Sequence, residues 1–235
     1  MIIRENIELY MAELRQWLET VKNEPPEAMD AFFNARIAGY EEHMQIWADA
    51  YRRFAQLLPI PPGQILDLGV GTGLELDEIW ARDPAIPVTG VDMSRAMLDQ
   101  LAQKHSDKDL QLICDDYFHY DMGESKWDTV ISFESFHHFL HDEKLALYRK
   151  IFWGLKPGGA LLLGDYIACC NEEEELLRSV YLEKRKRYAI PAGKFIHMDI
   201  PMTLEHETAI LKEAGFQSVT PLDSIAGATI LIAAK

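Results

Sequence analysis

Hydrophobic residues recur at helical spacing through the first part of the chain. Apolar side chains three or four positions apart predict a helix over residues 5–22, and Pro25 and Pro26 end it because proline lacks the N–H that a helix interior needs. Further helical stretches are predicted at 28–37 and 40–58. The first sixty residues are therefore expected to form a helical lid, a brace, or the contact between two copies in a homodimer.

From Ile65 onward, short apolar runs alternate with amphipathic ones. This alternation predicts an α/β fold with a mostly parallel sheet and helices on both faces. Ser94, Asp142 and Asn171 are predicted to cap the N-termini of helices, and Gly215 to end the last helix. Strands are expected at 65–68, 87–91, 110–114, 129–133, 160–163, 217–222 and 229–233.

Acidic residues follow four of the first five predicted strands. Ligands of open α/β sheets bind at the carboxyl ends of the strands, so these side chains are expected to share one edge with a ligand. The residues are Asp92, the pair Asp115 and Asp116, Glu134, and Asp165.

A glycine-rich turn follows the first strand. Residues 64–75 read Q-I-L-D-L-G-V-G-T-G-L-E, and a strand that leads through glycines into a helix brings bare backbone N–H groups up to a ligand. A dinucleotide fingerprint would need glycine at position 74, where Leu74 stands, which argues against a nicotinamide oxidoreductase. No Gly-Lys-Ser/Thr follows, so the phosphate-binding loop of ATPases is absent.

The composition argues against several classes of binding partner and cellular location. The 235 residues are 48% hydrophobic and carry a formal charge of −15, which argues against nucleic acid or an anionic membrane as the main partner. The three cysteines give no disulfide framework and no zinc spacing, and the first residues lack the pattern of a signal peptide. No apolar run approaches the roughly 18 residues of a membrane span. A cytoplasmic protein is expected.

The motifs after the glycine turn resemble those of class I S-adenosylmethionine-dependent methyltransferases. I-L-D-L-G-V-G-T-G is similar to the family's first motif, V-D-M-S at 91–94 to the second, and C-D-D-Y at 114–117 to the adenine-contacting position. W-D-T-V-I-S-F-E-S-F-H-H-F and L-K-P-G-G-A-L-L-L follow in the family's order. The resemblance implies a three-layer, Rossmann-like, doubly wound sheet of seven strands, with one antiparallel strand near the C-terminus.

The resemblance also implies the cofactor, S-adenosylmethionine, with S-adenosylhomocysteine as product. Asp92 is expected to hold the ribose hydroxyls and Asp115, in preference to Asp116, the adenine amino group. The glycines leave room for the ligand that a Cβ would fill, and the helix N-terminus suits the methionine carboxylate. The expected cofactor-binding residues are Asp67, Gly69, Gly71, Gly73, Asp92, Met93, Asp115, Asp116 and Phe133.

The acceptor side is less defined by sequence. His137 or His138, just beyond the fourth strand, is the candidate general base, since histidine titrates near neutrality. The spacing His137-His138-x-x-His141-Asp142 suits no common metal site, so no metal is expected. The substrate-side candidates are Tyr40, Glu134, Asp165 and His197, together with Lys194 and Asp199 from the same loop as His197.

A single domain over 1–235 is expected, with a helical cap or brace (1–60), a cofactor-binding core (61–166), an insertion or lid (167–202) and a C-terminal helix with a strand pair (203–235). The predicted activity is methyl transfer to N, O or S of a small molecule by in-line displacement. The motif of amino-methylating DNA enzymes is absent, because the fourth strand ends in F-E-S-F. A tRNA or protein methyltransferase, or a non-catalytic S-adenosylmethionine-binding regulator, remains the alternative.

Overall fold

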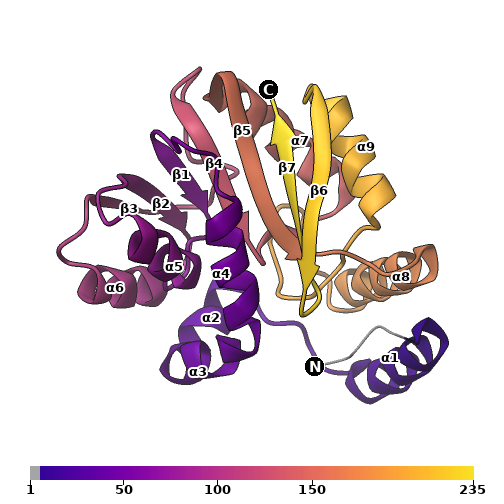
Figure 1. Ribbon diagram of the computed structural model, residues 1–235. Coiled ribbons are helices and arrows are strands. Elements are labelled where there is room, and N and C mark those ends of the chain that lie inside the picture. The colour runs from indigo at the N-terminus through magenta and orange to yellow at the C-terminus, as the bar shows by residue number, and fades with distance from the viewer. Residues whose placement is uncertain (1–5) are drawn as a thin grey trace.

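Seven strands form one sheet in the computed structural model, which describes residues 6–235. The strand order is β3-β2-β1-β4-β5-β7-β6, with β1 at the centre of the parallel part (Figure 1). β7 runs antiparallel to both of its neighbours, and the other pairs are parallel. The predicted seven-stranded sheet with one antiparallel strand near the C-terminus is confirmed. The strands are β1 (Ile65–Leu68), β2 (Val88–Asp92), β3 (Leu110–Cys114), β4 (Trp127–Phe133), β5 (Leu155–Tyr166), β6 (Ser218–Ile225) and β7 (Ala228–Ala234).

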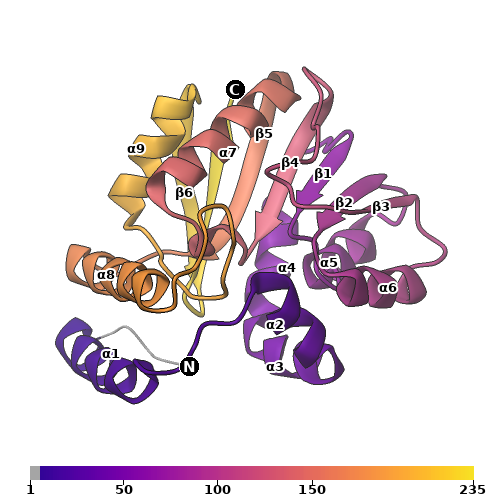
Figure 2. The same cartoon turned by 180° about the vertical axis from the view of Figure 1, so that it is seen from behind.

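Helices cover both faces of the sheet, which explains why the central strands are apolar on both sides. One face packs against α4 (Ala48–Leu57), α5 (Leu74–Arg82) and α6 (Arg95–Lys104). The other packs against α7 (His141–Gly154) and α9 (Leu204–Ala214) (Figures 1 and 2). Successive residues of β1 alternate between the two cores, with Ile65 in the first and Leu66 in the second. The result is the three-layer, doubly wound arrangement that the sequence predicts.

The remaining helices lie beyond the carboxyl edge of the parallel strands. α1 (Ile7–Val21) packs along α8 (Asn171–Arg187) through a cluster that includes Leu14 and Leu177, and both views show the two helices side by side (Figures 1 and 2). α2 (Met29–Arg36) and α3 (Tyr40–Met44) lie below α4 (Figure 1). Residues 1–5 lie outside the described residues. They include the first residue of the helix predicted over 5–22 and the start of the N-terminal stretch that lacks a signal-peptide pattern.

Some predicted boundaries are wrong. β5 begins at Leu155, well before the expected residue 160, because Leu155 already pairs with Trp127 beyond a register shift. The helix expected over 40–58 is interrupted by a 3₁₀ turn at Gln45–Trp47. Ser94 is confirmed as a cap, since its Oγ accepts from the backbone N–H of Met97 at 3.3 Å.

Two predicted caps are wrong by one or two positions. α7 begins before Asp142, and the side chain of Glu143 accepts from the N–H of Leu140 at 2.8 Å instead. Asn171 is the first residue of α8 rather than its cap. Gly215 does end α9, with a φ of 118° that favours glycine. No helix of residues 6–235 is long and apolar enough to cross a membrane.

Candidate active site

The glycine turn between β1 and α5 adopts backbone conformations that favour glycine. Gly69, Gly71 and Gly73 have φ values of 79°, 51° and 70°. A Cβ on Gly71 would meet nothing closer than Tyr40 Oη at 3.9 Å, so it would project into open space. A Cβ on Gly73 would instead lie 2.7 Å from Leu101 Cδ1. The first of these two glycines therefore keeps space free for a ligand, whereas the second allows α6 to pack closely.

Asp92 ends β2 beside this turn. Its Oδ2 accepts from the N–H of Gly71 at 2.9 Å and its Oδ1 from the N–H of Ser94 at 2.7 Å. Burial raises the pKa of Asp92, and the two backbone N–H groups oppose that rise. Each carboxylate oxygen has more than one lone pair, so both can still accept from a ligand. The geometry suits two vicinal hydroxyl groups.

Asp115 and Asp116 follow β3. Asp115 Oδ1 accepts from the N–H of Asp116 at 2.8 Å, and Asp116 Oδ1 accepts from the N–H of Phe118 at 2.8 Å. These bonds fix the turn after the strand. Both residues line the same pocket as Asp92.

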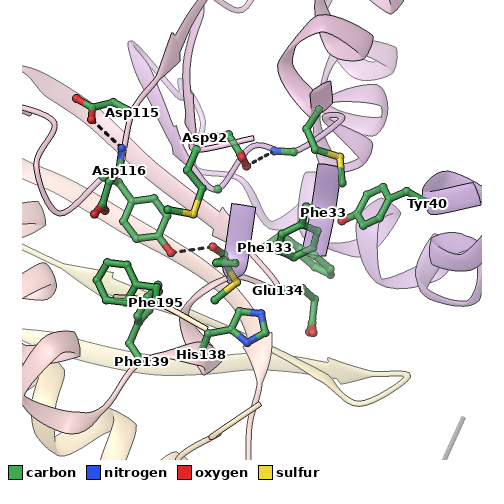
Figure 3. A pocket seen from close by; sticks show the side chains of 17 residues that line it. Phe33, Tyr40, Asp92, Asp115, Asp116, Phe133, Glu134, His138, Phe139 and Phe195 are labelled. Atoms are coloured by element: carbon green, nitrogen blue, oxygen red, sulfur yellow. Dashed lines mark hydrogen bonds between the residues drawn. The ribbon is translucent and has the colours of Figure 1, made fainter. Parts of the chain in front are cut away.

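A single pocket joins the cofactor side to the acceptor side. Figure 3 shows Asp92, Asp115 and Asp116 on one side of it and His138 with Phe139 on another. The residues that line it are Met29, Phe33, Tyr40, Gly69, Gly71, Asp92, Met93, Met97, Asp115, Asp116, Tyr117, Phe133, Glu134, Ser135, His138, Phe139 and Phe195.

Some of the residues proposed from sequence do not line this pocket. On the cofactor side these are Asp67, which is fully buried beneath the turn, and Gly73. On the acceptor side they are His137, Asp165 and the three residues of one loop, Lys194, His197 and Asp199. The other proposed residues do line it.

Sequence reasoning missed several lining residues. Tyr117, Ser135 and Phe139 lie within the motifs that carried the family resemblance, so their positions could have been inferred. Phe33 and Phe195 lie far outside those motifs, and no pattern in the sequence points to them.

The adjacent histidines at the end of β4 have different environments. His137 Nδ1 lies 2.6 Å from Asp165 Oδ1, and both side chains are buried. Burial opposes a charge on His137, but the carboxylates of Asp165 and Asp199 outweigh it and raise the pKa of His137 well above its ordinary value. Burial, together with the charge on His137, lowers the pKa of His138 well below its ordinary value. His138 Nδ1 donates to the carbonyl of Met198 at 3.2 Å.

The segment after α8 supplies a carboxylate above this pair. Asp199 Oδ1 lies 3.5 Å from His137 Nε2 and 3.4 Å from His138 Nδ1. His137 lowers the pKa of Asp199, although desolvation acts in the opposite direction. His197 stacks on Phe32 with ring centroids 3.4 Å apart, and burial lowers the pKa of His197 to about 4. Sequence reasoning singled out both His197 and Asp199 as substrate-side candidates, but not the contact of Asp199 with the two histidines.

The N-terminal segment and the insertion meet beside the pocket. The N–H of Met29 donates to the carbonyl of Phe195 at 3.2 Å, and the N–H of His197 donates to the carbonyl of Glu27 at 3.0 Å. Met29 and Phe195 both line the pocket. Two segments about 165 positions apart in sequence thus form one wall of it.

Comparisons with known proteins agree with this geometry. Residues 65–159 match the model of a family described as a methyltransferase domain. The chain is 24% identical to a carboxy-S-adenosyl-L-methionine synthase of Nautilia profundicola, over 83% of this chain and 86% of the relative. It is 30% identical to phosphoethanolamine N-methyltransferase 2 of Caenorhabditis elegans, over 75% of this chain but 41% of that protein.

Solved structures share the fold. The putative methyltransferase in a complex with the Trm112 activator of Haloferax volcanii superposes with a TM-score of 0.67 at 18% identity, covering 88% of this chain and 97% of that one. The fold, the glycine turn and the acidic strand ends are those of a nucleoside-binding α/β protein. Together with the match over residues 65–159, they make this part of the chain a class I S-adenosylmethionine-dependent methyltransferase domain.

The residues at the pocket fit this cofactor. Open space at Gly71, two accepting oxygens on Asp92 and the aspartates after β3 match the backbone approach, the ribose and the adenine of S-adenosylmethionine. The cofactor supplies an electrophilic methyl group on a sulfonium. No Lys or Arg is among the lining residues that the structure describes, which suits a positively charged sulfonium.

Proposed function

We propose that the protein transfers a methyl group from S-adenosylmethionine to N, O or S of a small molecule. The observation that carries this proposal is that the cofactor-side carboxylates and His138 line one pocket, with a wall made by Met29 and Phe195. A pocket walled by two separate segments suits a small acceptor better than an RNA or a protein surface. A tRNA or protein methyltransferase, or a non-catalytic regulator, is the alternative.

Charge narrows the acceptor further. None of the described lining residues is Lys or Arg, whereas Asp92, Asp115, Asp116 and Glu134 all contribute carboxylates. A phosphorylated acceptor would need cationic partners to offset its desolvation. The acceptor is therefore uncharged or cationic, unlike the phosphoethanolamine in the name of the Caenorhabditis elegans relative.

Aromatic side chains give the acceptor side an apolar wall. Tyr117 and Phe118 pack on Phe139, and Phe195 packs on both Phe118 and Phe139. Tyr117 Oη and Ser135 Oγ lie 3.0 Å apart and offer hydrogen-bonding groups beside it. An acceptor with an apolar or aromatic body fits this combination.

Catalysis then depends mainly on positioning. Methyl transfer from a sulfonium is an in-line displacement. Holding both reactants in line lowers the barrier, because the entropy cost of bringing them together is met when they bind. His138 lines the pocket and contacts the acceptor side, while His137 lies behind it, hydrogen-bonded to Asp165. A cytoplasmic location and a homodimer stay predictions.

The charge of the acceptor can be tested with fractionated metabolites. A small-molecule extract is divided into anionic and non-anionic pools by anion exchange, and each pool is incubated with the protein and methyl-labelled S-adenosylmethionine. We expect label in the non-anionic pool, reduced in His138→Ala and unchanged in His43→Ala, whose histidine is exposed and is not among the residues that line the pocket. Label confined to the anionic pool would contradict the proposed acceptor.

A further inference from the structure

We propose that His137, His138 and Asp199 form a binding site for one divalent transition-metal ion of the zinc type. Asp199 Oδ1 lies 3.5 Å from His137 Nε2 and 3.4 Å from His138 Nδ1. These three ligand atoms all lie within 4.8 Å of one another. Two imidazoles and a carboxylate are ligands that zinc and its neighbours accept.

The distances favour a metal over hydrogen bonds. A charge-assisted N–H···O hydrogen bond spans about 2.7–2.9 Å, which is shorter than either distance to Asp199. Two ligands of a tetrahedral zinc ion, each about 2.0–2.1 Å from the metal, lie roughly 3.3–3.4 Å apart. The carboxylate of Asp199 is thus too far from both rings for a strong hydrogen bond and at the separation that a shared ion requires.

The neighbouring carboxylate, Asp165, has a different role. Its Oδ1 lies 2.6 Å from His137 Nδ1, which is a hydrogen-bond distance and too short for two ligands of one ion. Histidine ligands of metals commonly donate their second ring N–H to a carboxylate, which fixes the orientation of the ring. Asp165 therefore orients His137 so that Nε2 faces Asp199.

The backbone holds Asp199 above the histidine pair. The N–H of Ile200 donates to the carbonyl of His137 at 2.7 Å, and the carbonyl of Met198 accepts from His138. The residues on both sides of Asp199 are thus tied to the two histidines. Metal binding requires His138 to move its Nδ1 proton to Nε2, which gives up the hydrogen bond to Met198 and leaves the Ile200–His137 bond as the tie to Asp199. It also requires His137 to lose its Nε2 proton, because every imidazole ligand must offer a lone pair.

Three protein ligands leave a coordination position open, as catalytic zinc sites do. His138 lines the pocket and Asp199 is half-exposed, so the ion would border the acceptor side. This step rests on the proposed function: an acceptor hydroxyl or thiol that binds the ion loses its proton to solvent. Its oxygen or sulfur then attacks the methyl carbon as the carbon–sulfonium bond breaks, and that electron pair stays on the sulfur of S-adenosylhomocysteine.

Sequence spacing could not have found this site. Asp199 lies about sixty residues from the histidines and reaches them only through the fold of the insertion. His141 and Asp142, which share the local histidine-rich stretch, contact each other and are exposed at the start of α7. His141 is therefore a matched control, since it has the same side chain without the ligand geometry.

The test is metal binding by the full chain, without any acceptor. The protein is stripped with a chelator and titrated with Zn²⁺ by calorimetry and with Co²⁺ by visible absorption. We expect one equivalent to bind, with the absorption bands of four-coordinate Co²⁺. Asp165→Asn should weaken binding by roughly 10–100-fold, as loss of a supporting residue does, and Asp199→Asn or His138→Gln by more than that.

A control variant and a check of folding accompany the titrations. His141→Gln should bind as the wild type does, and the melting temperature of each variant shows whether it has folded. Equal affinity in the wild type and the folded Asp199→Asn variant would overturn the proposal, as would the absence of a stoichiometric site in the wild type. Because binding needs no turnover, its failure leaves the proposed methyl transfer standing, and a failed acceptor search leaves the metal site standing.

Discussion

The N–H of Gly71 donates to the Oδ2 of Asp92 at 2.9 Å, which joins the glycine turn after β1 to the end of β2. The bond sets the carboxylate beside the space that the missing Cβ of Gly71 leaves open. One ligand can therefore contact both the backbone of Gly71 and the carboxylate of Asp92, which accepts hydrogen bonds from hydroxyl groups.

Replacing Asp92 by Ala should weaken binding of S-adenosylmethionine by at least about tenfold. A hydrogen bond to a charged group contributes roughly 1.5–3 kcal/mol, and Asp92 can accept two from a ribose. Calorimetric titration measures the loss, and thermal unfolding checks that the variant is folded. Asp107→Ala removes an exposed carboxylate and should leave the affinity unchanged. Unaltered affinity in Asp92→Ala would remove Asp92 from the cofactor site.

Gly71→Ala should mainly weaken cofactor binding, whereas Gly73→Ala should mainly lower the stability of the fold. Both positions have a positive φ, so each alanine carries a similar strain of about 1–2 kcal/mol. At Gly71 the new methyl group enters the pocket and should reduce cofactor binding more than stability. At Gly73 it lies 2.7 Å from Leu101 Cδ1 and should reduce stability more. Cofactor titration and denaturant unfolding of both variants separate the two effects. Equal losses of cofactor affinity and equal losses of unfolding free energy in the two variants would contradict the prediction.

Stability should fall as pH rises, because of the buried acids near the turn. Burial raises the pKa of Glu75 from 4.5 to about 7, and burial with the charge of Glu75 raises that of Asp67. A raised folded pKa means that the native state binds the proton more tightly, so stability is full below the unfolded pKa and is lost between pH 4.5 and 7.

Glu75→Gln removes one of these protons and should flatten the pH dependence. We expect Glu75 alone to lower the free energy of unfolding of the wild type by about 3 kcal/mol over that range, because its pKa rises from 4.5 to about 7 at roughly 1.36 kcal/mol per pKa unit. Denaturant titrations without cofactor measure it. The exposed Glu124→Gln should keep the wild-type slope, and an equal slope in Glu75→Gln would be the contrary result.

Lys144 and Glu207 form a fully buried ion pair between α7 and α9, with Nζ and Oε2 2.7 Å apart. Tyr148 also donates to Glu207. Lys144→Met leaves Glu207 as an uncompensated buried charge and should cost about 3–5 kcal/mol of stability, and adding Glu207→Leu should recover much of that loss.

The same two helices provide the control for this prediction. Arg149 and Glu213 form an exposed pair at 3.2 Å, and Arg149→Met should cost less than about 1 kcal/mol. Equal losses for Lys144→Met and Arg149→Met in denaturant unfolding would show that burial does not decide the contribution of these pairs.

Local patterns predict the sheet and the cofactor side well, for a physical reason. A run such as Ile65–Leu68 followed by Gly69 carries its strand, its turn and its ligand approach within a few residues. Asp92 is brought to the turn by the parallel pairing of β1 and β2, which alternating strands and helices imply. The antiparallel β7 follows from the family resemblance rather than from periodicity.

The acceptor side is assembled by tertiary contacts that no local pattern encodes. Phe33 comes from an N-terminal helix and Phe195 from a loop, and a backbone bridge between Ala28 and Ile196 brings the two segments together. Asp199 reaches the histidines through the same loop. Which residues form such a pocket wall depends on how the two segments pack against each other, and hydrophobic periodicity within either segment does not encode that packing.

In the proposed function, one pocket binds S-adenosylmethionine and a small molecule that receives its methyl group. The most direct measurement incubates the full chain with methyl-labelled cofactor and cell extract, then separates small molecules from RNA and protein. We expect label in the small-molecule fraction with the wild type and with Asp107→Ala, and a marked loss with Asp92→Ala. Label in the RNA or protein fraction, or none in any fraction despite tight cofactor binding, would contradict it.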